Sequence, residues 1–329
     1  MKKISIIIPV YNVEGYLETM AKSLLSQNWE NLQVIFSDDG STDGSLAILR
    51  RLAENDPRIT VVTGANGGVS SARNRALRLA DGDYIGFCDA DDSLAPDYLS
   101  TLVSLLEEHG ADCAVCGFDR IYEASGKADR MPPKDAEDAV VDREGFFEKM
   151  LRPDGYTTVV WNKLFRREVL LDETGEFLRF AEDLHIVEDG EYLFRCGVEK
   201  AVFTTRRLYR YTVRKSGAMY GRLNPRKLTE IEARKRIAAL ASPCSKGVSD
   251  LAKMKYQKGV RDLLFHAVID GQYGDVKHLI PLMKEYKAEL FTSPAVSKKE
   301  KLKYRIYPII IRLNLRRTGK FLMDKLSGH

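Results

Sequence analysis

Three carboxylates end an apolar stretch of this chain. Residues 84–88 are apolar or aromatic apart from Gly86, and Asp89, Asp91 and Asp92 follow at once. Alternate side chains of a strand share a face, so Asp89 and Asp91 can point the same way. Two like charges held so close repel each other unless a cation lies between them. Oxygen ligands suit Mg²⁺ or Mn²⁺, and one or two carboxylates leave positions for phosphate oxygens, so the stretch predicts metal–phosphate binding.

The alternative for this stretch is a polar turn without a ligand. Asp92 or Ser93 would then cap the next helix, which Pro96 would open. Histidine offers no competing metal site, because the five histidines are scattered without ligand spacing.

The elements that precede these acids alternate between strand and helix. Apolar runs at residues 4–9, 32–36, 59–62 and 84–88 predict strands, and helical spacing of apolar residues fills the intervals. This order predicts a doubly wound, mostly parallel α/β sheet, whose ligands bind beyond the carboxyl ends of the strands. A polar cluster follows each predicted strand, so four clusters should meet at one rim: Asn12, Asp38-Asp39, Asn66-Gly67-Gly68 and Asp89-Ala90-Asp91.

The remainder of the chain is patterned less regularly. Residues 113–118 predict a further strand, and 119–140 are polar enough to predict an exposed irregular excursion. Asp142 is placed to cap the helix that follows. Beyond about residue 221 the apolar spacing is purely helical.

Composition sets outer bounds on the class of protein. The chain has 329 residues, 44% of them hydrophobic and 30% charged, which is typical of a soluble globular protein. No stretch approaches the roughly 18 apolar residues of a membrane span, and no leader pattern precedes the first strand, so we expect a cytoplasmic location. The five cysteines are scattered, and Cys113 and Cys116 lie in a predicted strand, so buried free thiols are expected rather than a zinc site.

Charge is distributed unevenly along the chain. The formal net charge is +4, but residues 298–325 alone carry +8, which leaves about −4 for the rest. This balance argues against general nucleic-acid binding. Lys and Arg alternate with apolar and aromatic residues over 301–312, as in segments that bind anionic membrane surfaces. A basic helix packed on the catalytic domain is the alternative.

The chain resembles the bacterial family 2 glycosyltransferases of the GT-A fold. Six segments match in the family's order across about 1–220: SIIIPVYN (5–12), SDDGSTD (37–43), NGGVSSARN (66–74), DADD (89–92), WNKLF (161–165) and ED (188–189). The resemblance implies transfer of a sugar from a nucleoside diphosphate donor with inversion at the anomeric carbon. It divides the chain into a catalytic domain at 1–220, with a donor half at about 1–118 and an acceptor half at about 140–220, and a helical region at 221–329.

The resemblance also implies roles for particular residues on the donor side. Asp91 would be the direct metal ligand, and Asp89 would contact the ribose or the water shell of Mn²⁺ or Mg²⁺. Asp39 would accept hydrogen bonds from the nucleobase or ribose. Arg73, which lies off the apolar stripe of its helix, would reach the base or donor edge; its alternative is a solvated surface arginine. The full donor-binding set is Pro9, Tyr11, Asn12, Asp39, Asn66, Arg73, Asp89, Ala90 and Asp91.

On the acceptor side an alcohol needs a base to begin taking its proton. Asp189 of the Glu188-Asp189 pair is assigned this role by its place at a helix start and by the family's Glu-Asp pair, with Asp183 as the fallback. The alternative is that the two carboxylates only stabilise the N-terminus of the helix by charge–dipole attraction. The remaining acceptor-side or phosphate-clamp candidates are Trp161, Asn162, Lys163, Arg214 and Lys215.

The function these residues predict is an inverting, metal-dependent glycosyltransferase that uses a nucleoside diphosphate sugar, with UDP most favoured. The acceptor would be a glycan or a lipid-linked glycan in bacterial surface polysaccharide synthesis, at the inner face of the plasma membrane. Two rivals are a non-catalytic scaffold subunit and a nucleotidyltransferase. The second would need a Gly-rich phosphate loop after the first strand, which residues 9–15 lack.

Overall fold

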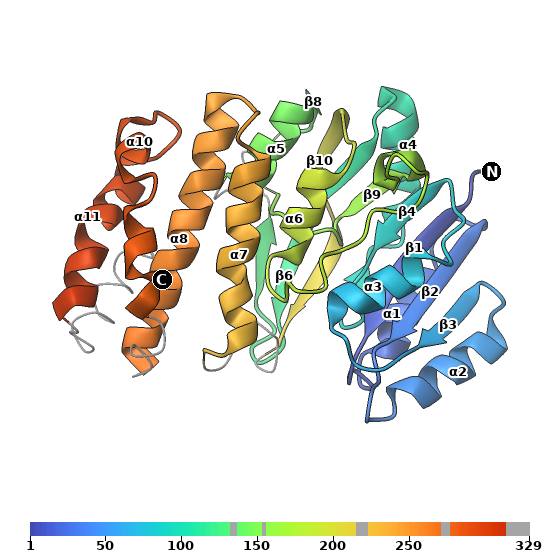
Figure 1. Ribbon diagram of the computed structural model, residues 1–329. Coiled ribbons are helices and arrows are strands. Elements are labelled where there is room, and N and C mark those ends of the chain that lie inside the picture. Colours follow the sequence, from blue (N-terminus) through green and yellow to red (C-terminus); the bar gives the residue numbers. More distant parts are fainter. Residues whose placement is uncertain (132–136, 153–155, 215–222, 271–276, 314–329) are drawn as a thin grey trace. The chain divides into compact units, whose positions relative to one another are not determined.

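The computed structural model divides into two compact units, Met1–Gly217 and Ala218–His329. It describes residues 1–131, 137–152, 156–214, 223–270 and 277–313 (Figure 1). The sequence placed the domain boundary at residue 220, and the division between the units falls within 215–222, outside the described residues.

Four parallel strands form the first half of the sheet. Strand β1 (Ile4–Val10) lies between β2 (Leu32–Asp38) and β4 (Tyr84–Phe87), and β3 (Ile59–Thr63) pairs with β2. Strand β1 is buried at nearly every position, as expected for the centre of a sheet covered on both faces. All four predicted strands are present, and their carboxyl ends reach the same rim.

The predicted helices between these strands are also present. They are α1 (Leu17–Leu25), α2 (Ser45–Asn55), α3 (Val69–Leu77) and α4 (Tyr98–His109). Helix α4 begins two residues after Pro96, with Asp97 at its N-cap position, and the short strand β5 (Ser93–Leu94) precedes Pro96. The alternative in which Asp92 or Ser93 caps this helix is therefore wrong.

The second half of the sheet makes it mixed rather than purely parallel. Strands β6 (Cys113–Tyr122) and β10 (Lys200–Val213) pair in parallel, and β9 (Lys163–Arg166) runs antiparallel between β4 and β6. The order across the sheet is β3-β2-β1-β4-β9-β6-β10-β5. Strand β9 thus joins the two halves.

The excursion predicted for residues 119–140 contains strands that the sequence did not indicate. Strand β6 continues to Tyr122, turns near Gly126 (φ +63°) and returns as β7 (Ala128–Met131). Strand β8 (Ala139–Asp142) pairs with β10. These strands are held by backbone pairing and are largely exposed, so their composition carries no apolar alternation to reveal them.

Two helices lead to the acceptor half of the first unit. Asp142 Oδ1 accepts from Gly145 N at 2.9 Å and caps α5 (Arg143–Leu151), as predicted. After β9, the single-turn η1 (Arg167–Leu170) leads to a loop and then to α6 (Glu188–Arg195). Helix α6 begins at the Glu188-Asp189 pair.

The second unit is helical, as its spacing predicts. It contains α7 (Pro225–Leu240), α8 (Lys246–Asp270), η2 (Lys277–Lys284), α10 (Lys287–Thr292) and α11 (Lys298–Leu313). Tyr256, Val260 and Leu264 of α8 are fully buried in its core. Across the part of the chain that the structure describes, no helix combines the length and apolarity needed to cross a membrane.

Candidate active site

The acidic end of β4 is anchored by the neighbouring strand β10. The Tyr209 hydroxyl donates to Asp92 Oδ2 at 2.6 Å, and Thr212 N donates to Asp92 Oδ1 at 2.7 Å. The same hydroxyl accepts from Asp89 N at 3.1 Å. Burial raises the pKa of Asp92. Asp92 thus ties the acidic turn to β10, while Asp89 and Asp91 remain more exposed.

Asp91 is paired with an arginine that follows β10. Arg214 Nη2 lies 2.5 Å from Asp91 Oδ2, and each side chain is less than one-fifth exposed. The Arg214 guanidinium also lies over the ring of Tyr16, 5.0 Å from its centroid. A predicted metal ligand and a predicted phosphate clamp are therefore in direct contact. Lys215, the other predicted clamp residue, lies outside the described residues.

Arg73 connects the two sets of predicted acids. Its Nη2 lies 3.2 Å from Asp89 Oδ1, and its Nη1 donates to Glu188 Oε1 at 3.1 Å and to Asp189 Oδ1 at 2.5 Å. The side chain is 3% exposed, so Arg73 is not the solvated surface arginine of the alternative. Residues more than a hundred positions apart thus form one charged cluster.

The cluster holds more negative than positive charge. Burial, followed by repulsion from Asp91 and Asp189, raises the pKa of Asp89 to about 6 despite its contact with Arg73. Burial and the neighbouring Asp189 raise the pKa of Glu188 to about 8. One guanidinium therefore does not balance these carboxylates, and a further cation would be favoured beside them.

The donor set for a divalent cation is accordingly small but chemically suitable. Within the described ranges, no group of three or more His, Cys, Asp or Glu side chains is arranged to hold a metal ion. Asp89 and Asp91 alone would provide hard oxygen ligands, and the remaining positions would fall to phosphate oxygens of a ligand. Asp89 and Asp91 are therefore chemically suitable as part of the ligand set of Mg²⁺ or Mn²⁺.

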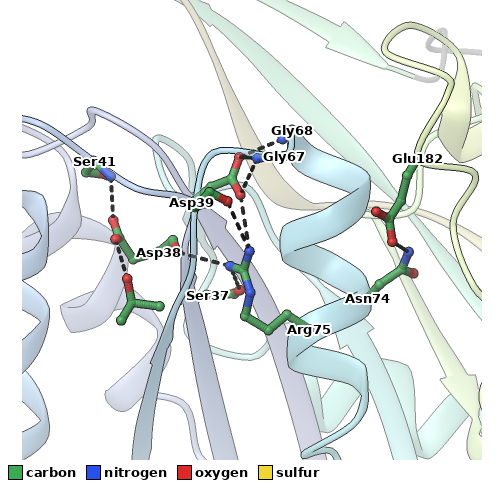
Figure 2. Close-up of polar contacts among 11 residues, drawn as sticks. Ser37, Asp38, Asp39, Ser41, Gly67, Gly68, Asn74, Arg75 and Glu182 are labelled. Carbon is green, nitrogen blue, oxygen red and sulfur yellow. Dashed lines mark hydrogen bonds and ion pairs between the residues drawn. The ribbon is translucent and has the colours of Figure 1, made fainter.

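Asp39 lies at the amino end of α3, as Figure 2 shows. Its carboxylate accepts from Gly67 N at 3.1 Å and from Gly68 N at 2.7 Å, and Arg75 Nη2 lies 3.4 Å away. The neighbouring Asp38 instead closes its own turn, accepting from Ser41 N at 3.2 Å. Gly67 N also lies 3.2 Å from the second oxygen of Asp39, so three donor groups engage this carboxylate, and Asp39 is 3% exposed.

The other predicted donor residues lie along the same rim. Tyr11, Asn12 and Asn66 are exposed, whereas Pro9 is half-buried and Ala90 is buried. Asn12 has φ +50° and accepts from Thr42 N at 2.8 Å, which fixes the β1 exit against the Asp38–Asp39 turn. The strand ends thus converge as the sequence predicts.

The segment Trp161-Asn162-Lys163 is buried and makes its observed contacts with the protein itself. Trp161 stacks on Tyr209 and Tyr211, with centroids 4.4 and 5.4 Å apart. Lys163 Nζ donates to Val159 O at 2.6 Å and to Asn162 Oδ1 at 2.8 Å. Burial lowers the pKa of Lys163 to about 8. The observed contacts of this segment are therefore structural ones.

Asp189 is held at the start of α6 by groups from two other elements. Its Oδ1 contacts Arg73, and its Oδ2 accepts from Val160 N at 3.1 Å. The preceding residue, Val187, has φ +67°, which is rare for a β-branched residue and typical of functional sites. Asp183, the fallback base, is exposed.

Several contact residues carry no signal that would single them out in the sequence. Arg75 contacts Asp39, Tyr209 contacts Asp92, and Tyr16 lies beneath Arg214. Tyr209 stands in a strand-like run where any aromatic residue suits the core. Arg75 shares its helix with Arg73, and only the helical phase places them against different acids.

Comparison with solved structures identifies the fold, and a family model identifies the class of protein. The fold matches S. aureus TarS 1–349 solved in complex with UDP-GlcNAc, with a TM-score of 0.68 and 19% identity over 99% of this chain and 92% of that one. The mixed sheet with a helical C-terminal region is thus that of a GT-A-type glycosyltransferase. A family model described as glycosyl transferase family 2 matches residues 5–172, just over half of the chain, and the chain belongs to this family.

Bacterial relatives agree with this assignment. The chain is 34% identical to the uncharacterized glycosyltransferase YibD of Escherichia coli over 64% of its own length and 61% of that protein. It is also 34% identical to the uncharacterized glycosyltransferase EpsJ of Bacillus subtilis, over 69% of its own length and 63% of that protein. The chain thus spans about three-fifths of the length of these relatives.

Proposed function

We propose that this glycosyltransferase inverts the anomeric centre in a single displacement and takes its sugar from a nucleoside diphosphate, UDP in the first instance. The observation that carries the proposal is the shared guanidinium of Arg73, which brings Asp89 of the donor side to the candidate base Asp189. The fold neighbour TarS, solved with UDP and with UDP-GlcNAc, supports the choice of nucleotide.

The donor would lie along the carboxyl ends of the parallel strands. Asp39 would accept from the nucleobase or ribose, and the exposed Tyr11, Asn12 and Asn66 would line the same rim beside Pro9 and Ala90. Gly67 and Gly68 would let the backbone approach the ligand closely. Arg214 and Lys215 would contact the diphosphate through charge-assisted hydrogen bonds.

Asp91, with Asp89 beside it, would hold Mn²⁺ or Mg²⁺. When bound, the cation would neutralise the diphosphate as negative charge builds on it during departure. Support for a metal comes from the excess negative charge of the acidic cluster. It also comes from a fold neighbour, the mannosyltransferase PcManGT of Pyrobaculum calidifontis, solved with GDP-Man and Mn2+.

Asp189 would take the proton of the acceptor hydroxyl as that oxygen attacks the anomeric carbon opposite the leaving diphosphate. Arg73 and Val160 N each engage one oxygen of its carboxylate, so the carboxylate is held in one orientation and keeps lone pairs for the hydroxyl. Trp161, Asn162 and Lys163 would support the acceptor side, together with Glu188.

The acceptor is proposed to be a glycan or a lipid-linked glycan of the bacterial surface. The hyaluronan synthase and the chondroitin synthase of Pasteurella multocida are each 43% identical to this chain over 94 residues, 29% of its length. The basic segment that includes α11 would hold the enzyme peripherally at an anionic membrane, where a lipid-linked acceptor also lies.

Calorimetric titration with a panel of nucleoside diphosphates and their sugars, with and without Mn²⁺, tests this function. We expect UDP to bind in the presence of Mn²⁺ and to bind at least tenfold more weakly without it. Asp91→Asn should remove this dependence on Mn²⁺. Asp189→Asn should retain UDP binding and lose sugar transfer, because the base acts after the donor is bound.

The control is Asp97→Asn, an acid of the same loop region that pairs with Arg206 away from the cluster. It should behave as the unchanged protein does. Metal-independent UDP binding, or an absence of binding by every nucleotide in the panel, would contradict the proposed donor site.

A further inference from the structure

Arg73 is buried where a donor-contacting arginine would need to be open. Its side chain is 3% exposed, and its guanidinium also lies over the ring of Phe180, 5.2 Å from the centroid. Asn74, the next residue on α3, holds the backbone of Phe180, because it donates to Phe180 O at 2.9 Å and accepts from Phe180 N at 2.7 Å. The arginine is therefore enclosed by protein on several sides.

The planar fork of the guanidinium lets it bind acids on both sides at once. Nη2 faces Asp89 of the β4 end, whereas Nη1 faces the pair at the start of α6. A lysine ammonium is a single point charge and has no such fork. The contacts of Arg73 therefore depend on its shape as well as on its charge.

Resting on the proposed function, we infer that Arg73 is a positioning residue for the catalytic base. It orients the Asp189 carboxylate beside the buried Glu188 and fixes its distance from the donor-side Asp89. The role is one of coupling the two halves of the site rather than of contacting the nucleotide.

Burial and charge support this role over simple packing. Burial and the neighbouring Asp189 raise the pKa of Glu188 to about 8, so this acid holds a proton near neutral pH. Burial opposes the charge of Arg73, but the carboxylates of Asp189, Asp89 and Glu188 raise its pKa above its ordinary value. Lys163 also lies close enough to Asp189 for the two charges to interact.

The first test is a double-mutant cycle on stability, which needs no ligand. Arg73→Gln removes the counter-charge and should lower the melting temperature, since it leaves a buried carboxylate unpaired. Asp189→Asn in the same chain should recover much of that loss, because it removes the unpaired charge. Arg78 is an exposed arginine at the end of the same helix, so Arg78→Gln is the charge-matched control and should leave the melting temperature unchanged. If the changes in melting temperature caused by Arg73→Gln and Asp189→Asn simply add in the double variant, the two side chains are not coupled and the inference is wrong.

The second test is the pH profile of nucleotide-sugar hydrolysis, with UDP-GlcNAc and UDP-glucose as probes. Removal of a cation in contact with a carboxylate raises that carboxylate's pKa by about 1–3 units, so the acid limb of kcat should move up by at least about one unit in Arg73→Gln. We also expect kcat to fall about 10²-fold with less change in KM. Arg73→Lys, the variant for use where the glutamine variant does not fold, should show the loss of kcat with a smaller shift of the limb.

The outcomes separate this inference from the function on which it rests. If the unchanged protein neither binds UDP with Mn²⁺ nor hydrolyses a probe, the proposed function fails, while the stability cycle still decides the pairing. If the unchanged protein binds and turns over the donor, and Arg73→Gln loses rate with the acid limb unmoved, Arg73 is only a packing residue and the inference is wrong.

Discussion

Two arginines account for most of the charge balance at the site. Arg73 faces Asp89, Glu188 and Asp189, and Arg214 faces Asp91. Buried ion pairs add little net stability compared with apolar packing, although loss of one partner costs about 3–5 kcal/mol. Pairs of this kind are better explained by a need to hold charge in place than by the demands of folding.

Substitution of Arg214 should have opposite effects on the metal and on the nucleotide. A divalent cation must compete with Arg214 for Asp91, so Arg214→Gln should tighten Mn²⁺ binding several-fold in the absence of nucleotide. The same change should weaken UDP binding at saturating Mn²⁺ by about tenfold, because a charge-assisted hydrogen bond to phosphate is lost. Electron paramagnetic resonance of Mn²⁺ and calorimetry of UDP measure the two effects.

Arg210→Gln supplies the control for this pair of measurements. Arg210 is exposed on β10, the strand that precedes Arg214, and its removal changes the charge of the protein equally. If Mn²⁺ and UDP both bind more weakly to Arg214→Gln, the arginine does not compete with the metal.

At the scale of elements, the site depends on short segments that hold side chains in fixed positions. Helix α6 starts at Glu188 only because Val187 takes a left-handed conformation. Strand β9 starts at Lys163, whose ammonium donates hydrogen bonds to the carbonyl oxygens of Thr157 and Val159. The loop so formed supplies Val160 N to Asp189. Both ends of the acceptor side are therefore set by local backbone geometry.

Val187→Asn should stabilise the protein by relieving this conformation. Asparagine tolerates the left-handed region, which costs other residues roughly 1–2 kcal/mol. We expect a rise in melting temperature of about 2–4 °C in a scanning measurement. Val140→Asn, at an exposed strand position of ordinary φ, should instead lower it slightly. An equal change in both variants would contradict strain at Val187.

Lys163 should make stability depend on pH in the alkaline range. Its pKa is lowered from 10.5 to about 8 in the folded protein, so the unfolded chain binds more protons between these values. Stability contributed through this group should therefore rise as pH increases from about 8 to 10.5, by roughly 3 kcal/mol at most.

Urea unfolding of Lys163→Met at pH 7.5 and pH 10, set against the unchanged protein, isolates this effect from that of other groups. The variant should lack the difference. Lys200→Met, at an exposed position of β10, should retain it. A rise of equal size in Lys163→Met would show that other groups cause the pH dependence.

At the scale of the whole molecule, the excess of positive charge lies in the second unit. Helix α11 begins with the exposed Lys298 and Lys299, and the exposed Leu302 follows one turn later. Anionic lipid attracts such residues by about 1 kcal/mol each. The proposed membrane association is therefore a property of charge density and not of a spanning helix.

The double variant Lys298→Glu and Lys299→Glu tests this in the full chain. It should float with phosphatidylserine vesicles at least tenfold less than the unchanged protein, because two positive charges are reversed and the net charge falls by four units. Binding to neutral vesicles should be equally weak for both. A chain ending at Ser297 should behave like the variant, and equal flotation of all three proteins would contradict membrane binding by this segment.

Much of the first unit could be predicted from its pattern of apolar residues. Strands β1, β2 and β4 are buried, β3 is half-buried, and amphipathic helices separate the four, so the apolar periodicity is visible in the sequence. Strands β7 and β8 could not be predicted, because exposed strands held by backbone pairing leave no apolar alternation. The short strand β5 before Pro96 could not be predicted either, because it depends on pairing with β10, a contact between distant segments.

The sequence by itself determined the family, the strands of the first half of the sheet and the rim where the acidic residues gather. These follow from local periodicity and from motifs in order, which are properties of neighbouring residues. Only the tertiary structure decided which carboxylate pairs with which arginine. Asp91 faces Arg214, whereas Asp89 and Asp189 both face Arg73. The physical reason is that pairing energies depend on burial and on distances of a few ångströms between segments far apart in the chain, which no local pattern encodes.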